Sequence, residues 1–116
     1  MGENVQKNCV VLKITGEAIS GVGGQLFDKG AIEYITGEIA ECYRSLRAQI
    51  AIVPGGGNIM RRKGSELLDV ISSIDADDIG MQATVINGRI LCSALAKRHI
   101  NARMMSAIRA PAEPYI

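Results

Sequence analysis

The stretch IAIVPGGGNIMRRKG, residues 50–64, decides how the rest of the chain is interpreted. A short apolar run ends at Pro54, three glycines follow, and a cluster of cations comes directly after them. Glycine accepts positive φ and has no side chain, so the backbone N–H groups of Gly55, Gly56 and Gly57 can approach a ligand closely. The pattern favours an anion site at the end of a strand. The alternative is an ordinary strand-to-helix turn with a solvated basic face.

The cations after the glycines suit a phosphate group. A helical turn that starts there would add N–H donors and partial positive charge. Arg61 would lie one turn further on, and a guanidinium holds two phosphate oxygens at once. The stretch is not a Walker A motif, which needs Gly-Lys-Ser/Thr after four spacers. It is not a dinucleotide fingerprint either, because Met60 stands where that motif needs glycine.

Apolar patterns on both sides of this stretch predict alternating strands and helices. Residues 9–12 are a continuous apolar run, and residues 48–54 are apolar except for Gln49. Both runs are typical of strands buried on both faces. Residues 29–47 repeat apolar side chains at three- and four-residue steps, which predicts a helix.

Beyond the cations, residues 65–71 favour a short helix, and SSIDADD offers several caps for a long one. Residues 100–108 predict a third strand, and residues 109–116, with two prolines, a loop-like tail. The long helix is expected to bury an apolar stripe made of Ile79, Ala83, Ile86, Ile90 and Ala94.

The predicted fold class is α/β: a parallel β-sheet with flanking helices in the order β-α-β-α-β. Ligands of such sheets bind beyond the carboxyl ends of the strands. Lys13, the three glycines and Ser106 each end or follow an apolar run, so we expect them at one edge of the sheet. The chain shows no repeat and no internal boundary, and we expect residues 1–116 to form a single domain.

Composition narrows the classes of function. The 116 residues are 47% hydrophobic and 22% charged with a net charge of +1, which is globular and lacks the basic excess of a nucleic-acid binder. Cys9, Cys42 and Cys92 are widely spaced, so neither a zinc site nor a disulfide framework is indicated. We expect buried, reduced thiols in a cytoplasmic protein. No apolar run is long enough to span a membrane.

Two further residues are candidates for a functional role. Lys13 follows a strand and precedes a glycine-rich loop, where a cation is able to stabilise charge on a transferring phosphoryl group. The alternative is a strand-end lysine that reaches into solvent. Asp77 opens the long helix, and its carboxylate offers only acceptors, which suits two neighbouring ribose hydroxyls. The alternative is an N-cap or a first-turn acid favoured by the helix dipole.

Four segments, in this order, resemble the motifs of bacterial-type uridylate kinases (UMP kinases) of the amino-acid-kinase superfamily. VVLKITGEAISG is similar to the family's LLKLSGEAL, and IVPGGGNIMR is similar to VIGGGNxFRG. DDIGMQATVING resembles DHMGMLATVMN, and INARMMSAI resembles VxARLMSAI. The four cover almost the whole chain at family-like spacing, so the chain resembles the N-terminal, UMP-binding part of such a kinase.

The resemblance implies a role for each matching residue. Lys13 matches the lysine that contacts the transferring phosphoryl group. Arg61 matches the arginine that binds the UMP phosphate, and Asp77 matches a contact to the UMP ribose. The glycines that approach the nucleotide phosphates match Gly16, Gly55, Gly56 and Gly57. Pro54, Asp78 and the sequence MRRKG depart from the family pattern.

The resemblance also implies the reaction, which is transfer of the ATP γ-phosphoryl group to UMP with Mg²⁺, giving UDP for pyrimidine nucleotide biosynthesis. Catalysis of this kind depends on positioning and charge neutralisation. Family members are roughly twice as long as this chain and remain within single-domain size. The ATP site and the Mg²⁺ ligands are therefore expected in the part that this chain lacks, and residues 1–116 are expected to be an incomplete, N-terminal portion without metal ligands.

We accordingly do not expect the chain alone to phosphorylate UMP. The family is generally hexameric, which implies a homo-oligomer. The alternative function is a non-catalytic module of the same fold that binds a nucleotide or an oxyanion or serves oligomerisation.

Overall fold

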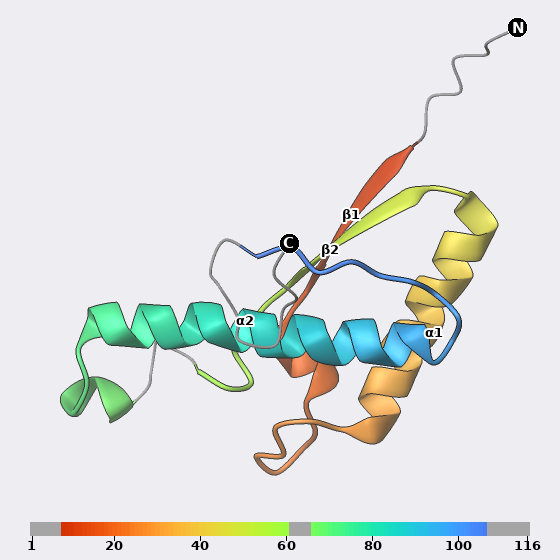
Figure 1. Ribbon diagram of the computed structural model, residues 1–116. Coiled ribbons are helices and arrows are strands. Elements are labelled where there is room, and N and C mark those ends of the chain that lie inside the picture. Colours follow the sequence, from red (N-terminus) through yellow and green to blue (C-terminus); the bar gives the residue numbers. More distant parts are fainter. Residues whose placement is uncertain (1–7, 61–65, 107–116) are drawn as a thin grey trace, which may run out of the picture.

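The computed structural model describes residues 8–60 and 66–106 (Figure 1). Strand β1 (Cys9–Ile14) is followed by a short 3-10 helix, η1 (Gly16–Ile19), and by helix α1 (Lys29–Leu46). Strand β2 (Gln49–Pro54) comes next, then a second 3-10 helix, η2 (Glu66–Asp69), and the long helix α2 (Ser73–Ala96). The predicted order is therefore confirmed as far as α2.

The two strands pair in parallel, with a register that runs from Cys9 opposite Gln49 to Ile14 opposite Pro54. Helix α1 makes the crossover between them, and α2 contacts both α1 and β2. The predicted class, a parallel sheet with flanking helices, is confirmed, and in Figure 1 the strands lie side by side while α2 passes across their carboxyl ends.

The predicted third strand is wrong for the part of it that is described. Residues 100–106 form no strand, and the sheet of the described residues has two strands. A Cβ added at Gly88 of α2 would lie 3.5 Å from Met104 Cε and 3.6 Å from Pro54 Cγ, so the segment runs past α2 near the end of β2. A strand exists only through bonds to a neighbour, and strand propensity does not supply that neighbour. Residues 107–116 lie outside the described residues.

The helix starts follow from local hydrogen bonds. The Asp28 carboxylate accepts from the Ala31 N–H at 2.8 Å and caps α1. The Ser72 hydroxyl accepts from the Asp75 N–H at 3.0 Å and caps α2, as the cluster SSIDADD predicted.

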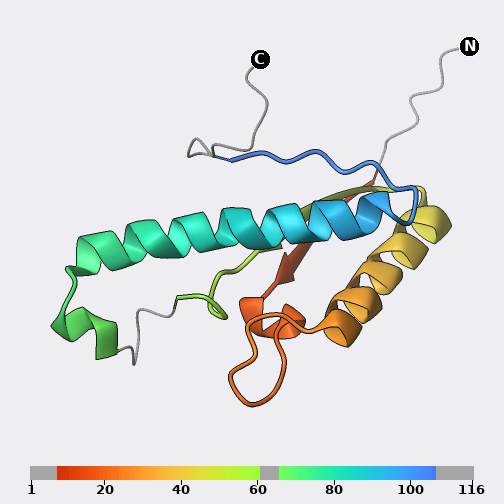
Figure 2. The ribbon, with the colours of Figure 1, turned by 60° about the horizontal axis from the view of Figure 1, so that its bottom comes forward.

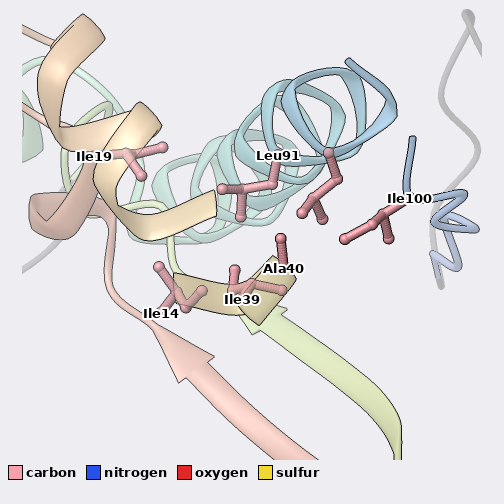
Figure 3. Close-up of a cluster of buried hydrophobic side chains, with 7 residues drawn as sticks. Ile14, Ile19, Ile39, Ala40, Leu91 and Ile100 are labelled. Carbon is pink, nitrogen blue, oxygen red and sulfur yellow. The ribbon is translucent and has the colours of Figure 1, made fainter. Parts of the chain in front are cut away.

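Both helices cover the same face of the sheet. In the core, Ile14 of β1 is buried with Ile39 of α1 and Leu91 of α2 (Figure 3). The opposite face carries Val11, which is 62% exposed, and Val53, which is 48% exposed. The expectation of strands buried on both faces is therefore wrong for the described residues, because the helices pack on one side only.

The buried side of α2 also differs from the predicted stripe. Ile79 and Ile86 are 37% and 46% exposed, and of the predicted stripe Ala83 is fully buried. The side chains that α2 buries are those of Ala76, Ala83, Asn87, Leu91 and Leu95. A small side chain is needed at position 83, because Gly56 packs directly against Ala83.

The three cysteines are free thiols, and the expectation of burial is wrong for Cys9, which is exposed. Cys42 and Cys92 are half-buried. Burial raises the pKa of the Cys92 thiol, and the positive charge of Arg89 opposes this shift in part. Among the described residues, no helix is both long enough and apolar enough to cross a membrane.

Candidate anion-binding site

The candidate site is built on the turn that follows β2. The Gly55 N–H donates to Ile14 O at 2.7 Å and extends the strand pairing by one bond. The N–H groups of Ile59 and Met60 both donate to Gly56 O at 3.0 Å, which makes a single helical turn. This is the turn that the glycine stretch predicted. Pro54 is tolerated because it ends the strand, where its missing donor disturbs no further pairing.

Two of the glycines bring this turn into direct contact with other parts of the backbone. A Cβ at Gly16 would lie 2.6 Å from the Asn58 nitrogen and 2.8 Å from the Gly57 nitrogen. A Cβ at Gly56 would lie 2.8 Å from Ala83 Cβ and 2.9 Å from Gly80 O, both on α2. Real Cβ atoms do not come this close, so the η1 loop, the turn and α2 meet only because these positions are glycine.

The neighbouring Gly57 faces a side chain. A Cβ there would lie 2.8 Å from Glu17 Oε1, so the Glu17 carboxylate lies against the turn. This acidic group stands beside a site proposed for an anion, and sequence reasoning gave it no role. An anion at Gly57 requires that Glu17 be neutralised by a cation or move aside.

A buried asparagine joins the pieces. Asn87 of α2 is 1% exposed, and its Nδ2 donates to Gly55 O and to Asn58 Oδ1, each at 2.8 Å. Asn58 Nδ2 in turn donates to Leu26 O at 2.9 Å, in the loop between η1 and α1. Figure 2 shows that loop hanging beside η1. Sequence reasoning missed both asparagines, although a polar residue inside an apolar helix, as in VING, was an available signal.

Lys13 and the glycine turn lie at the same edge of the sheet, as predicted. Lys13 pairs with Val53, two residues before Gly55, and its side chain is exposed on the face away from the helices. Ser106 is exposed and follows Met104, the residue near Pro54, by two positions.

Asp77 is exposed in the second turn of α2. It is not the N-cap, because Ser72 fills that position. Gly80, whose carbonyl meets the glycine turn, lies three residues later, about 4.5 Å along the helix axis. Asp77 is therefore one helical turn away from the contact between α2 and Gly56.

The roles assigned to Lys13, Arg61, Asp77 and the glycines stay predictions. Arg61 itself lies outside the described residues, as do Arg62 and Lys63. Within the described ranges, no three side chains of His, Cys, Asp or Glu come together as a metal site. We assign no step to a Mg²⁺ ion here, and its involvement stays a prediction.

The parallel sheet, the glycine turn and the crossing helix define a class of protein. The profile of the Amino acid kinase family matches residues 8–114, and the chain belongs to that family. The uridylate kinase of Rubrobacter xylanophilus is 42% identical over an alignment of 111 residues, and the match covers 92% of this chain and 42% of that protein.

Solved structures give the same picture. The UMP kinase from Bacillus anthracis is 33% identical with a TM-score of 0.81 and matches 94% of this chain and 45% of its own. The UMP kinase from Ureaplasma parvum is 32% identical with a TM-score of 0.77 over 91% and 45%. The chain thus spans less than half the length of the relatives that it matches.

Proposed function

We propose that this chain is the UMP-binding portion of a UMP kinase, the enzyme that transfers the γ-phosphoryl group of ATP to UMP. The observation that carries the proposal is the junction at the sheet edge, where Gly16, the turn at Gly56 and the helix bearing Asp77 come together. The relatives that are similar over most of this chain are uridylate kinases.

The proposed roles follow from charge and shape. The glycine turn and Arg61 hold the UMP phosphate, because backbone N–H groups and a guanidinium both donate hydrogen bonds to phosphate oxygens. Asp77 accepts hydrogen bonds from the ribose hydroxyls. Lys13, at the end of β1, neutralises charge on the phosphoryl group in transit. ATP, with Mg²⁺, completes the reaction, and the groups that hold these two are not assigned to the described residues.

The phosphate role is tested by titrating the purified chain with UMP, using Arg61→Ala and the matched control Arg62→Ala. Loss of a hydrogen bond to a charged group costs about 1.5–3 kcal/mol, so Arg61→Ala should weaken UMP binding at least tenfold. Arg62→Ala should leave affinity nearly unchanged, because Arg61, and not Arg62, matches the arginine of the family motif. An equal or larger loss in Arg62→Ala would show that the assignment is wrong.

The ribose role is tested with 2′,3′-dideoxy-UMP. Wild type should prefer UMP over this analogue, and Asp77→Asn should discriminate less, because an amide supplies one acceptor where the carboxylate supplies two. If Asp77→Asn and Asp77→Ala discriminate as well as wild type does, Asp77 is not the ribose contact.

The proposal also covers turnover. The chain alone should release no ADP in a coupled assay with ATP, Mg²⁺ and UMP, because transfer requires both nucleotides held in line. Adding the C-terminal part of a related kinase should restore UMP-dependent ADP release. Turnover by the chain alone at about 1–100 s⁻¹, the usual range for kinases, would contradict this. We place this activity in cytoplasmic pyrimidine nucleotide biosynthesis.

A homo-oligomer, a hexamer by resemblance, is part of the proposal. It is supported by apolar side chains exposed along α2, where Ile74 is 72%, Met81 46% and Ile86 46% exposed. The test compares the sedimentation of the wild-type chain with that of the double variant Ile74→Glu/Ile86→Glu. A wild-type chain that sediments as a monomer at all concentrations would rule this part out.

A further inference from the structure

We propose that Asn87 is a positioning residue, whose buried amide holds the glycine turn in the shape that binds a phosphate without touching the ligand. The second half of this statement rests on the proposed function, whereas the first half concerns the free protein. The residue lies on α2 between Ala83 and Leu91, in a row that is otherwise small or apolar.

The orientation of the Asn87 amide is fixed by its partners. Nδ2 points at two acceptors, the Gly55 carbonyl and Asn58 Oδ1, each 2.8 Å away. A flipped amide would set an oxygen against two oxygens, and Asn58 cannot relieve this by flipping, because its Nδ2 donates to Leu26 O at 2.9 Å. The chain of bonds therefore has one direction, from α2 through the turn to the loop before α1.

The arrangement leaves one buried acceptor without a partner in the described part of the chain, so apolar packing alone does not account for an asparagine at this position. Asn87 is 1% exposed, and its Oδ1 finds no hydrogen-bond partner among the described residues. An unsatisfied buried acceptor destabilises a fold, and a leucine would continue the apolar row without that acceptor. What the amide supplies in return is a fixed position for both ends of the turn, Gly55 and Asn58.

The positions of these two ends determine the orientation of the backbone N–H groups that are proposed to bind the phosphate. Gly56 and Gly57 lie between them, and Gly16 packs directly on Asn58. If Asn87 releases Gly55 and Asn58, the N–H groups between them lose their common orientation. Binding of a phosphate must then order the turn, and the lost conformational entropy of the turn weakens the affinity. A ligand without phosphate does not need the turn to be ordered.

The test uses the whole chain with Asn87→Leu and, as matched control, Leu91→Val, which alters packing one turn further along the same face of α2. Hydrogen exchange of the ligand-free protein is measured first. In Asn87→Leu, exchange should rise at least tenfold in peptides covering residues 55–60 and 21–28, while α1 stays unchanged. In Leu91→Val, peptides 55–60 should keep wild-type exchange. Equal protection of the turn in wild type and Asn87→Leu overturns the proposal.

UMP and uridine titrations form the second arm. Asn87→Leu should lower affinity for UMP about tenfold and leave affinity for uridine unchanged. Undiminished UMP affinity, or equal losses for both ligands, overturns the positioning role. If wild type binds no UMP while the exchange result is as expected, the proposed function fails and the structural role of Asn87 stands.

A second variant, outside the buried core, keeps the proposal testable if Asn87→Leu fails to fold. Asn58→Ala removes the partner of Asn87 from a half-exposed position. It should raise exchange in the same two segments, and the double variant Asn87→Leu/Asn58→Ala should add little to either single change, because both break one chain of bonds. Fully additive effects would show that the two asparagines act separately and would overturn the proposal.

Discussion

The chain uses glycine in two neighbouring regions for two different reasons. In the junction at the sheet edge, Gly16 and Gly56 leave no room for a side chain. In the loop between η1 and α1, Gly23 and Gly24 have nothing within 4 Å of a Cβ, but their φ angles are +71° and +81°. The junction needs glycine for space, and the loop needs it for the left-handed backbone. The two uses predict different costs for one and the same substitution.

The largest effect is expected for Gly56→Ala. The new methyl would lie 2.9 Å from Gly80 O and 3.2 Å from Thr84 N, which are backbone atoms of α2 that cannot yield without moving the helix. Overpacking of this kind costs about 3 kcal/mol, measured as the loss of unfolding free energy in urea. UMP binding should be lost with it.

Gly80→Ala is the matched control, because a Cβ at Gly80 meets nothing within 4 Å. In the middle of α2 this change should stabilise the fold by about 0.5–1 kcal/mol. If Gly56→Ala and Gly80→Ala change the unfolding free energy in the same direction, the contact between the turn and α2 is not as described.

Gly16→Ala should cost about 2 kcal/mol in the same urea experiment. Its methyl would meet the backbone nitrogens of Gly57 and Asn58, and the turn that carries them can shift more easily than a helix. A cost below that of Gly24→Ala would remove the distinction between the two regions.

Gly24→Ala should cost about 1 kcal/mol, because an alanine at φ +81° is strained even where space is open. Gly24→Asn should cost less, since asparagine tolerates this region better than alanine. Neither change should alter UMP affinity. If alanine is tolerated at Gly24 without loss, the loop does not hold this backbone conformation in solution.

The smallest effect is expected for Gly57→Ala, at roughly 0.5 kcal/mol. Here the three atoms nearest to the methyl all belong to the end of the flexible Glu17 side chain. In the background Glu17→Ala, the added cost of Gly57→Ala should vanish, which a double-mutant cycle measures directly. A cost that persists without Glu17 would assign the strain to the backbone at Gly57.

The sequence was sufficient for the first half of the fold. Helix α1 and both strands could be predicted because apolar spacing and the turn chemistry of Asp28 agree. It predicted the long helix α2 and a cap within SSIDADD, but it was insufficient for the buried face of α2, because apolar side chains occur on more than one side of that helix. Of the predicted stripe, Ala83 is buried where Gly56 approaches α2, whereas Ile79 and Ile86 are 37% and 46% exposed.

The candidate site could be located from sequence more readily than it could be explained. The glycines and Lys13 do lie at one edge, because parallel strands end together. The close packing of Gly16 on Asn58, and the amide of Asn87 beneath it, depend on contacts between segments about 30 to 40 residues apart along the chain, and no local pattern encodes such contacts.

The open face of the sheet has a consequence for any experiment on Lys13. Val11 and Val53 stand exposed on that face, and Lys13 ends their row with a positive charge. A charge beside exposed aliphatic side chains opposes association of two molecules through that face. Replacing Lys13 by methionine would therefore reduce solubility as well as remove the proposed phosphoryl contact. Lys13→Gln keeps the polarity, and Lys13→Arg keeps the charge, so the pair separates chemistry from colloidal behaviour.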